Sequence, residues 1–267
     1  MTISILGCGW LGFPLAQHLL QKGYTIKGST TSESKLPILQ AEGIASYLIK
    51  ATPEVEGNLK FFKSDILILN IPPKRRTPQV EIFHPQQITS IIKAAKKGGI
   101  TKVIFASSTG VYPNTGGIVT EATPTNPVRN SRIALVKAEQ LLLAETTFQT
   151  TIVRLAGLVG GDRKAGRFFA GKTNIPNGNA RVNMVHRQDC IQIITTIIEQ
   201  NHWGEIFNVC AAQHPTKADF YTAQAQKQGF ATPSFLRNET TDFKIVSNEK
   251  VKQVLGYRFL WDDPMEF

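Results

Sequence analysis

The sequence predicts an α/β fold built around a doubly wound parallel sheet. Apolar runs typical of buried strands alternate with helical patterns over the first half of the chain. The first of these strands runs directly into a glycine-rich turn and then a helix, and no internal repeat or low-complexity linker interrupts the 267 residues. Buried strands that alternate with helices form parallel sheets covered on both faces.

The turn is Gly7-x-Gly9-x-x-Gly12. In this spacing Gly7 permits the tight turn, Gly9 lets the main chain approach a pyrophosphate, and Gly12 lets the helix pack closely on the strand. The helix, with Pro14 in its first turn and Gly23 at its end, then directs unpaired N–H groups at the phosphates. The motif predicts a Rossmann-type dinucleotide-binding sheet, with a structural turn that binds no ligand as the alternative.

The other elements follow in chain order. Strands are expected at residues 24–30, 45–49, 65–70, 102–107, 150–155 and 206–209. Helices are expected at 34–41, 85–97, 131–146, 189–199 and 217–228, the fourth of them N-capped by Asp189. We expect residues 1–160 to form the NAD(P)-binding Rossmann core. Residues 161–267 should complete that core and add a small C-terminal substrate-binding portion, all in a single compact unit, with the Gly-rich basic stretch 160–179 as a loop around a substrate cleft.

Composition narrows the class of protein. No apolar run approaches the ~20 residues of a membrane span, and Met1 leads straight into a strand without a signal peptide. Cys8, Cys190 and Cys210 lack CxxC spacing, so we expect reduced packing residues in a cytoplasmic protein and no metal site. The net charge of +10 is spread over short runs without interleaved aromatics, which favours a solvated surface or an anionic ligand over nucleic acid.

Further landmarks carry a resemblance to a family. They are residues 105–112 (Phe-Ala-Ser-Ser-Thr-Gly-Val-Tyr), Glu121 with Pro124 and Pro127, 137–139 (Lys-Ala-Glu), 154–157 (Arg-Leu-Ala-Gly) and 183–189 (Asn-Met-Val-His-Arg-Gln-Asp). In this order the chain resembles, over nearly its whole length, an atypical member of the extended short-chain dehydrogenase/reductases, the NAD-dependent epimerase/dehydratase family. The resemblance implies a Rossmann-type fold and chemistry on a small polar substrate, sugar-like or nucleotide-linked.

The same resemblance implies a catalytic set with one member missing. The family pairs a tyrosine with a lysine four residues later, and a serine polarises the reacting carbonyl. Ser108 matches the serine, and Lys137 matches the lysine, which also binds the nicotinamide ribose. Ile133 stands at the tyrosine position, and residues 128–136 contain no tyrosine. Tyr112 is a candidate replacement; a turn serine, a solvated lysine and a structural tyrosine remain the alternatives.

The end of the second strand favours NADP(H) over NAD(H). NAD-specific sites place a carboxylate there, whereas this chain has Thr30, Thr31 and Ser32 followed by Lys35. Glu33 and the lack of an arginine are the opposing features. The remaining cofactor positions implied by the resemblance are Cys8, Trp10, Leu11, Asn70, Ile71, Pro72, Ser107, Ala156, Gly157 and Leu158.

On the substrate side the resemblance implicates Arg163, Arg167, Asn183 and His186, the last as an acid/base or hydrogen-bonding group unless it is structural. Lys74-Arg75-Arg76 either faces an anionic substrate or forms a solvated loop. Two functions stay open. One is an NADP(H)-dependent oxidoreductase or epimerase; the other is a non-catalytic dinucleotide-binding regulatory or scaffold protein. A homodimer through the helices at 85–97 and 131–146 is the expected assembly.

Overall fold

The chain forms two compact units. The computed structural model describes residues 1–74, 77–238 and 242–267. Unit 1 comprises Met1–Val111, Asn126–Val153 and Ile197–Ile206, and unit 2 comprises Tyr112–Thr125, Arg154–Thr196 and Phe207–Phe267. The chain passes between the two units several times. The Rossmann core at residues 1–160 and the substrate-binding portion at 161–267 stay predictions.

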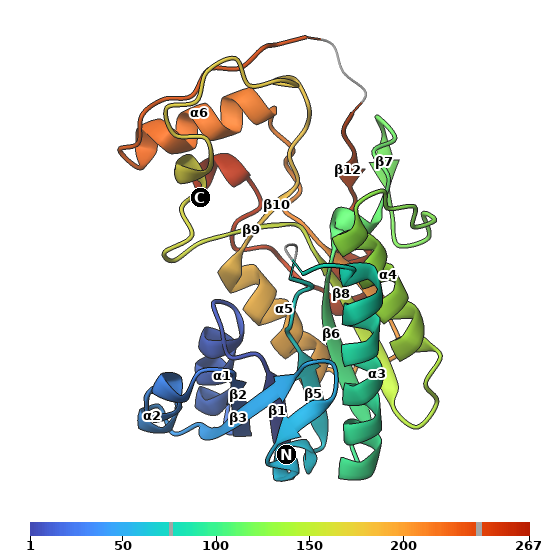
Figure 1. Cartoon of the computed structure of the whole chain (residues 1–267). Helices are drawn as coiled ribbons and strands as arrows, with labels where there is room; N and C mark the ends of the chain where they lie inside the picture. Colours follow the sequence, from blue (N-terminus) through green and yellow to red (C-terminus); the bar gives the residue numbers. More distant parts are fainter. Residues whose placement is uncertain (75–76, 239–241) are drawn as a thin grey trace. The chain divides into compact units, whose positions relative to one another are not determined.

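The main sheet has the strand order of a Rossmann fold. In the order β11-β8-β6-β5-β1-β2-β3-β4, β1 lies between β2 and β5 and pairs with both in parallel (Figure 1). β4 pairs antiparallel with β3 at the edge. The strands are β1 (Thr2–Leu6), β2 (Thr25–Thr30), β3 (Ala45–Ala51), β4 (Val55–Gly57), β5 (Ile66–Leu69), β6 (Lys102–Ser108), β8 (Gln149–Leu155) and β11 (Ile206–Val209). All seven predicted strands are therefore present.

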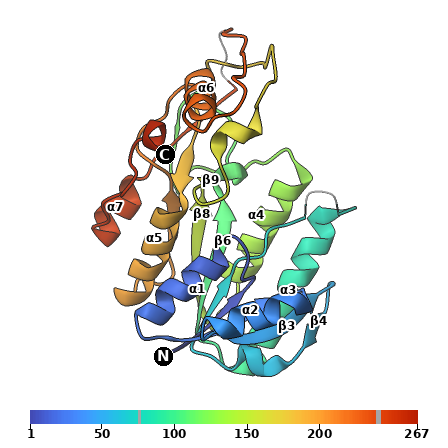
Figure 2. The same cartoon turned by 90° about the vertical axis from the view of Figure 1, so that its left-hand side faces the viewer.

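Helices cover the two faces of the sheet in unit 1. These are α1 (Gly12–Gln21), α2 (Leu36–Ala41), α3 (Val80–Gly98) and α4 (Asn130–Leu143), with short 3-10 turns η1 (Glu33–Lys35), η2 (Leu59–Phe62) and η3 (Thr109–Val111). Figure 2 shows α3 and α4 side by side on one face and α1 on the other. With helices on both sides, the residues of β5 and most of those of β1 and β6 are buried.

α3 begins five residues earlier than predicted, so Pro85 lies inside it. Proline has no N–H to give to the carbonyl four residues earlier, which here is that of Glu81. The Lys137 ammonium of α4 donates to this carbonyl oxygen (3.2 Å). A side chain from the neighbouring helix therefore supplies the hydrogen bond that Pro85 cannot make.

Unit 2 contains shorter elements around its own core. The helices are α5 (Arg187–Glu199, whose last turn belongs to unit 1), α6 (Lys217–Lys227), α7 (Glu249–Leu255) and the 3-10 turns η4 (Ala165–Phe168) and η5 (Pro264–Glu266). β9 (Gly157–Val159) pairs in parallel with β10 (Met184–His186), and β7 (Ile118–Val119) with β12 (Ile245–Val246). Strands of two or three residues are too short to show a period in the sequence, which is why none was predicted.

The prediction that Asp189 caps α5 is wrong. Asp189 is fully buried in the first turn, and its carboxylate accepts hydrogen bonds from the Tyr257 hydroxyl (2.8 Å) and from the main-chain N–H of Leu260 (2.7 Å) and Trp261 (3.3 Å). The His186 ring instead accepts from an N–H of that turn. Asp189 ties down a segment about 70 residues further along the chain, a partner that local sequence cannot reveal.

The described residues offer no reactive thiol, metal-binding cluster or membrane-spanning helix. All three cysteines are free and buried, and burial raises the pKa of the Cys8 thiol to about 12. No group of residues in the described ranges could hold a metal ion. Nor does that part of the chain contain a helix long and apolar enough to cross a membrane.

Candidate functional site

The β1–α1 turn needs glycine at two of its three positions for steric reasons. Gly7 has φ +105°, and a Cβ there would lie 2.6 Å from the carbonyl oxygen of Asn70. A Cβ on Gly12 would lie 2.2 Å from the Gly7 carbonyl oxygen, so the helix could not approach the strand. At Gly9 a Cβ would meet none of the described atoms within 4 Å. Gly7 and Gly12 therefore shape the turn, while Gly9 faces open space.

The N-terminus of α1 is uncapped. Leu11 occupies the cap position without a side-chain hydrogen bond, and the first main-chain bond of the helix joins Phe13 N–H to the Gly9 carbonyl (2.9 Å). Uncapped N–H groups and the positive end of the helix dipole favour an anion. The Cys8 N–H is already bonded to the Ser29 carbonyl (2.8 Å) and its thiol is buried, so Cys8 holds the turn.

Residues after β5 brace the same turn. The Asn70 side chain donates to the Gly7 carbonyl (3.0 Å), and the Ser29 hydroxyl of β2 accepts from Gly7 N–H (3.0 Å). β1 is the strand at which the sheet reverses its winding, because β2 follows on one side and β5 on the other. Ligands of doubly wound sheets bind at the carboxyl end of this position. The open space at Gly9 lies there.

The end of β2 presents hydroxyls and one ammonium group. Thr30 is buried, and its hydroxyl accepts from the Ser32 N–H (3.1 Å), which leaves it bound to its own loop. Thr31 and Lys35 are exposed, and the hydroxyls of Ser32 and Ser34 lie 2.9 Å apart. Among the residues predicted to bind the cofactor at the end of β2, three are therefore available to a ligand: Thr31, Ser32 and Lys35.

The end of β6 carries two serines with different partners. The Ser107 hydroxyl donates to the buried Glu139 carboxylate of α4. The Ser108 hydroxyl accepts from Gly110 N–H (3.1 Å), which leaves its own proton free to be donated. A Cβ on Gly110 would lie 3.2 Å from the Ser108 oxygen and 3.1 Å from Nε of Arg132. The Ser108 hydroxyl and the Arg132 guanidinium therefore both lie next to Gly110.

The face of α4 that meets β6 differs from the face we predicted. Glu139 contacts Ser107, and residues four positions apart share a helix face, so Leu135 and Ser131 belong to the row directed at β6. Lys137, with Ile133 one turn before it, lies in the row that meets α3. The contact with α3 gives Lys137 a structural role, and its cofactor role stays a prediction that this contact does not support.

Tyr112 belongs to a buried network in unit 2. Its hydroxyl accepts a hydrogen bond from Arg154 (2.6 Å) and donates one to the side-chain oxygen of Asn208 (2.8 Å). The main-chain N–H of Asn208 donates in turn to the Glu121 carboxylate (2.7 Å). Tyr112 is 1% exposed, and burial raises the pKa of its phenol despite the neighbouring guanidinium of Arg154. A proton donor at neutral pH needs the opposite shift, so the network favours the structural interpretation of Tyr112.

Comparison with known proteins now decides the family. The sequence profile of a family described as NAD(P)H-binding matches residues 7–201, from the glycine turn through α5. The chain belongs to the NAD(P)H-binding family. It is 36% identical over 268 residues to Protein YeeZ of Escherichia coli strain K12, an alignment that covers 98% of this chain and 97% of YeeZ.

Two solved structures share the fold of this NAD(P)H-binding chain. One is a short-chain dehydrogenase/reductase superfamily protein from Agrobacterium tumefaciens with bound NAD, at 17% identity and a TM-score of 0.77, covering 99% of this chain and 94% of that one. The other is UDP-glucose 4-epimerase from Thermotoga maritima with UDP-glucose, at 16% identity and a TM-score of 0.78, covering 97% and 94%. The predicted Rossmann-type fold and family resemblance are confirmed, and the chain is a dinucleotide-binding protein.

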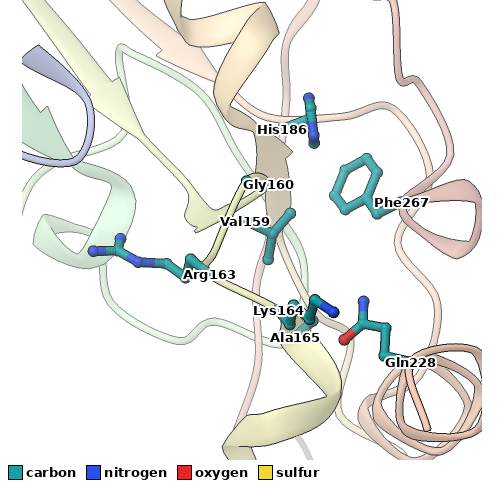
Figure 3. Close-up of a pocket in the computed structure, with 9 residues that line it drawn as sticks. Val159, Gly160, Arg163, Lys164, Ala165, His186, Gln228 and Phe267 are labelled. Atoms are coloured by element: carbon teal, nitrogen blue, oxygen red, sulfur yellow. The ribbon is translucent and has the colours of Figure 1, made fainter. Parts of the chain in front are cut away.

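Unit 2 of this NAD(P)H-binding protein holds a cavity of about 200 Å³ (Figure 3). It is lined by Val159, Gly160, Gly161, Arg163, Lys164, Ala165, His186, Gln228 and Phe267. Two predicted substrate residues, Arg163 and His186, therefore come together. The Asn183 side chain instead clamps the strand β12, donating to the Lys244 carbonyl (2.8 Å) and accepting from Val246 N–H (2.8 Å). Arg167 is exposed on η4 and does not line the cavity.

His186 is held as a neutral imidazole. Its Nδ1 accepts from Gln188 N–H (3.3 Å), which places the ring proton on Nε2. A Cβ on Gly160 would lie 2.6 Å from that Nε2, and Gly160 has φ +114°, so only glycine fits beside the ring. Burial lowers the pKa of His186, with the nearby Arg187 adding to the shift and Asp189 opposing it.

The other predicted positions are placed as follows. Ile71 packs against the Gly7 turn. Ala156 N–H bonds to the Val209 carbonyl (3.0 Å), and Gly157 N–H to the Asn183 carbonyl (2.9 Å), so both are held inside unit 2. Arg75 and Arg76 lie outside the described residues. Sequence reasoning missed four residues. Arg132 was missed because it has no place in the family's tyrosine–lysine pattern. Lys164, Gln228 and Phe267 were missed because only the fold brings them together.

Proposed function

We propose that the chain is an NADP(H)-dependent oxidoreductase or epimerase-like enzyme acting on a small polar substrate, sugar-like or nucleotide-linked. The observation that carries this proposal is the pairing of two features in one unit. An open, uncapped phosphate cradle lies at Gly9, and a hydroxyl with a free proton lies beside a guanidinium at the end of β6. Both belong to the carboxyl end of the same parallel sheet, where this fold binds its ligands.

When bound, NADPH supplies a hydride to the carbon of a substrate carbonyl. The Ser108 hydroxyl donates to the carbonyl oxygen, and the Arg132 guanidinium stabilises the negative charge that develops there as the π electrons move onto oxygen. An arginine does not exchange protons near neutral pH, so the proton that completes the alcohol comes from water. Ser108 and Arg132 thus polarise the carbonyl, and water supplies the proton that the missing tyrosine provides in the family.

The preference for NADP(H) follows from the end of β2. The exposed Thr31 hydroxyl and Lys35 ammonium suit a 2′-phosphate, and Glu33 is the opposing charge. The variant Lys35→Glu should weaken NADPH binding about tenfold or more while changing NADH binding little. Lys97→Glu makes the same charge change on the last turn of α3 and serves as the control. Equal losses for the two cofactors would contradict the preference.

The second candidate is a dinucleotide-binding regulatory or scaffold protein without hydride chemistry. The observation that favours it is on α4, where no tyrosine precedes Lys137 by one turn and the ammonium is occupied by the Glu81 carbonyl. Such a protein would bind the cofactor through Gly9 and the N-terminus of α1 and use the occupied and empty forms as a signal.

A titration followed by turnover separates the two. NADPH fluorescence is measured on the full chain, then its oxidation with small aldehydes, ketones and sugar nucleotides. Turnover that falls in Ser108→Ala and Arg132→Gln, with unchanged NADPH affinity, supports the enzyme. Tight binding without turnover on any substrate supports the second candidate. Absence of NADPH and NADH binding by the folded chain contradicts both.

A homodimer is the proposed assembly. α3 and α4 lie side by side in unit 1 and leave apolar side chains exposed, namely Ile82, Leu141 and Leu143. Light scattering of the full chain should give twice the mass of one chain, and Ile82→Lys with Leu143→Lys should return it to the monomer. A monomeric wild-type chain would exclude this assembly.

A further inference from the structure

The cavity of unit 2 is small, and its size limits what can enter it. It measures about 200 Å³. An apolar cavity of roughly 150 Å³ accommodates benzene, so this one takes a single ring with a short substituent, about ten non-hydrogen atoms in all. A whole nucleotide sugar is several times larger. The cavity therefore has room for one ring-sized group.

Its walls divide into an apolar floor and an aromatic side. Val159 and Ala165 form the floor and belong to the buried core of unit 2. The ring centroids of His186 and Phe267 lie 5.7 Å apart with the rings tilted by 52°, and the Trp261 ring contacts His186 at 5.0 Å. At these separations the rings contact one another directly, so they form one aromatic wall against which a planar ring can pack.

Its polar groups lie opposite the imidazole. Figure 3 shows the Lys164 ammonium and the Gln228 carboxamide on the side of the cavity away from His186, with the Arg163 guanidinium directed elsewhere. The Gln228 oxygen accepts from Gly166 N–H (2.9 Å), and its nitrogen donates to Gln224 (2.7 Å). The carboxamide is thus fixed with one N–H left to give. None of the nine lining residues has an acidic side chain.

We propose that this cavity binds a small aromatic carboxylate, whose ring lies against Phe267 and His186 and whose carboxylate meets Lys164 and the free N–H of Gln228. One point charge and one amide donor match a monoanion; a phosphate dianion would call for further donors or a bidentate arginine. This binding site lies wholly in unit 2 and goes beyond the proposed function, on which it does not rest. Binding itself requires no cofactor.

Benzoate and its uncharged analogue benzyl alcohol are the probes. Binding to the full chain is followed without NADPH by ligand-observed saturation-transfer NMR and by the fluorescence of its three tryptophans, of which Trp261 contacts His186. Saturable benzoate binding is expected, with benzyl alcohol weaker by roughly tenfold because it lacks the charge. Lys164→Gln should weaken benzoate by a similar factor, and Lys97→Gln, far along the sequence on α3, should not.

Three results would overturn the proposal. They are no saturable benzoate binding by the folded wild-type chain, equal binding of benzyl alcohol, and unchanged benzoate affinity in Lys164→Gln. Phe267→Ala adds a second variant: loss of the ring wall should weaken benzoate while circular dichroism shows that the chain stays folded. Because no step needs hydride transfer, failure of turnover leaves this test intact, and failure of benzoate binding leaves the cofactor titration intact.

Discussion

Replacing Gly9 with alanine separates cofactor binding from folding. A Cβ at Gly9 meets none of the described atoms within 4 Å, and its φ lies outside the left-handed region. The folded chain therefore accepts the methyl group without strain. The same methyl group would stand where a pyrophosphate approaches the main chain.

The magnitudes follow from that geometry. A glycine-to-alanine change at a compatible position stabilises a protein by about 0.4–1 kcal/mol through the unfolded state. Losing one or two charge-assisted hydrogen bonds to phosphate, at about 1.5 kcal/mol each, raises the NADPH Kd roughly ten- to hundredfold. The matched control is Gly12→Ala, whose Cβ would lie 2.2 Å from the Gly7 carbonyl oxygen. Displacing the helix to relieve that overlap costs about 1–3 kcal/mol.

Thermal unfolding by circular dichroism and NADPH fluorescence titration measure the two effects. Gly9→Ala should unfold at or slightly above the wild-type temperature and bind NADPH weakly. Gly12→Ala should unfold several degrees lower, at about 2–4 °C per kcal/mol. A Gly9→Ala protein that is folded and keeps the wild-type Kd would refute the placement of the phosphates at Gly9.

Three further outcomes are expected. Tyr112→Phe removes the hydroxyl that joins Arg154 to Asn208 and should lower the free energy of unfolding by about 1–3 kcal/mol, with NADPH affinity unchanged; loss of turnover without loss of stability would instead indicate catalysis. Hydrogen bonds from Thr147, with a further contribution from a lysine, lower the pKa of Glu145 from 4.5 to about 2. Its carboxylate therefore stabilises the fold above pH 4.5, and that contribution is lost as pH falls to about 2, so Glu145→Gln should flatten this part of an acid unfolding curve followed by fluorescence. Ellman's reagent should label none of the three buried thiols in the native chain and all three after denaturation, and rapid native labelling would contradict their burial.

Much of the fold could be predicted because its signals are local. All seven predicted strands and the three glycine positions are where the pattern placed them, since strand period and turn sterics act over a few residues. The ends of the helices were predicted less accurately than the strands. α3 starts before Pro85 because Lys137, more than fifty residues later, satisfies the Glu81 carbonyl that the proline leaves without a donor.

The catalytic residues were harder to predict than the cofactor turn. The resemblance to the family put Lys137 at the lysine position, but the contact of Glu139 with Ser107 shows that a different row of α4 meets β6. Spacing fixes which residues share a helix face and not which way that face points. Arg132 therefore came to notice only beside Gly110 in the folded chain.

Local patterns were enough to predict the Rossmann-type sheet, the dinucleotide turn and the absence of the family's tyrosine, because each pattern lies within a short stretch of chain. The folded chain was needed to see that Asp189 anchors the segment after α7, that Tyr112 bonds to both Arg154 and Asn208, and that Lys164 and Phe267 line one cavity. These contacts join residues from 42 to more than 100 positions apart, and packing of the whole chain brings them together.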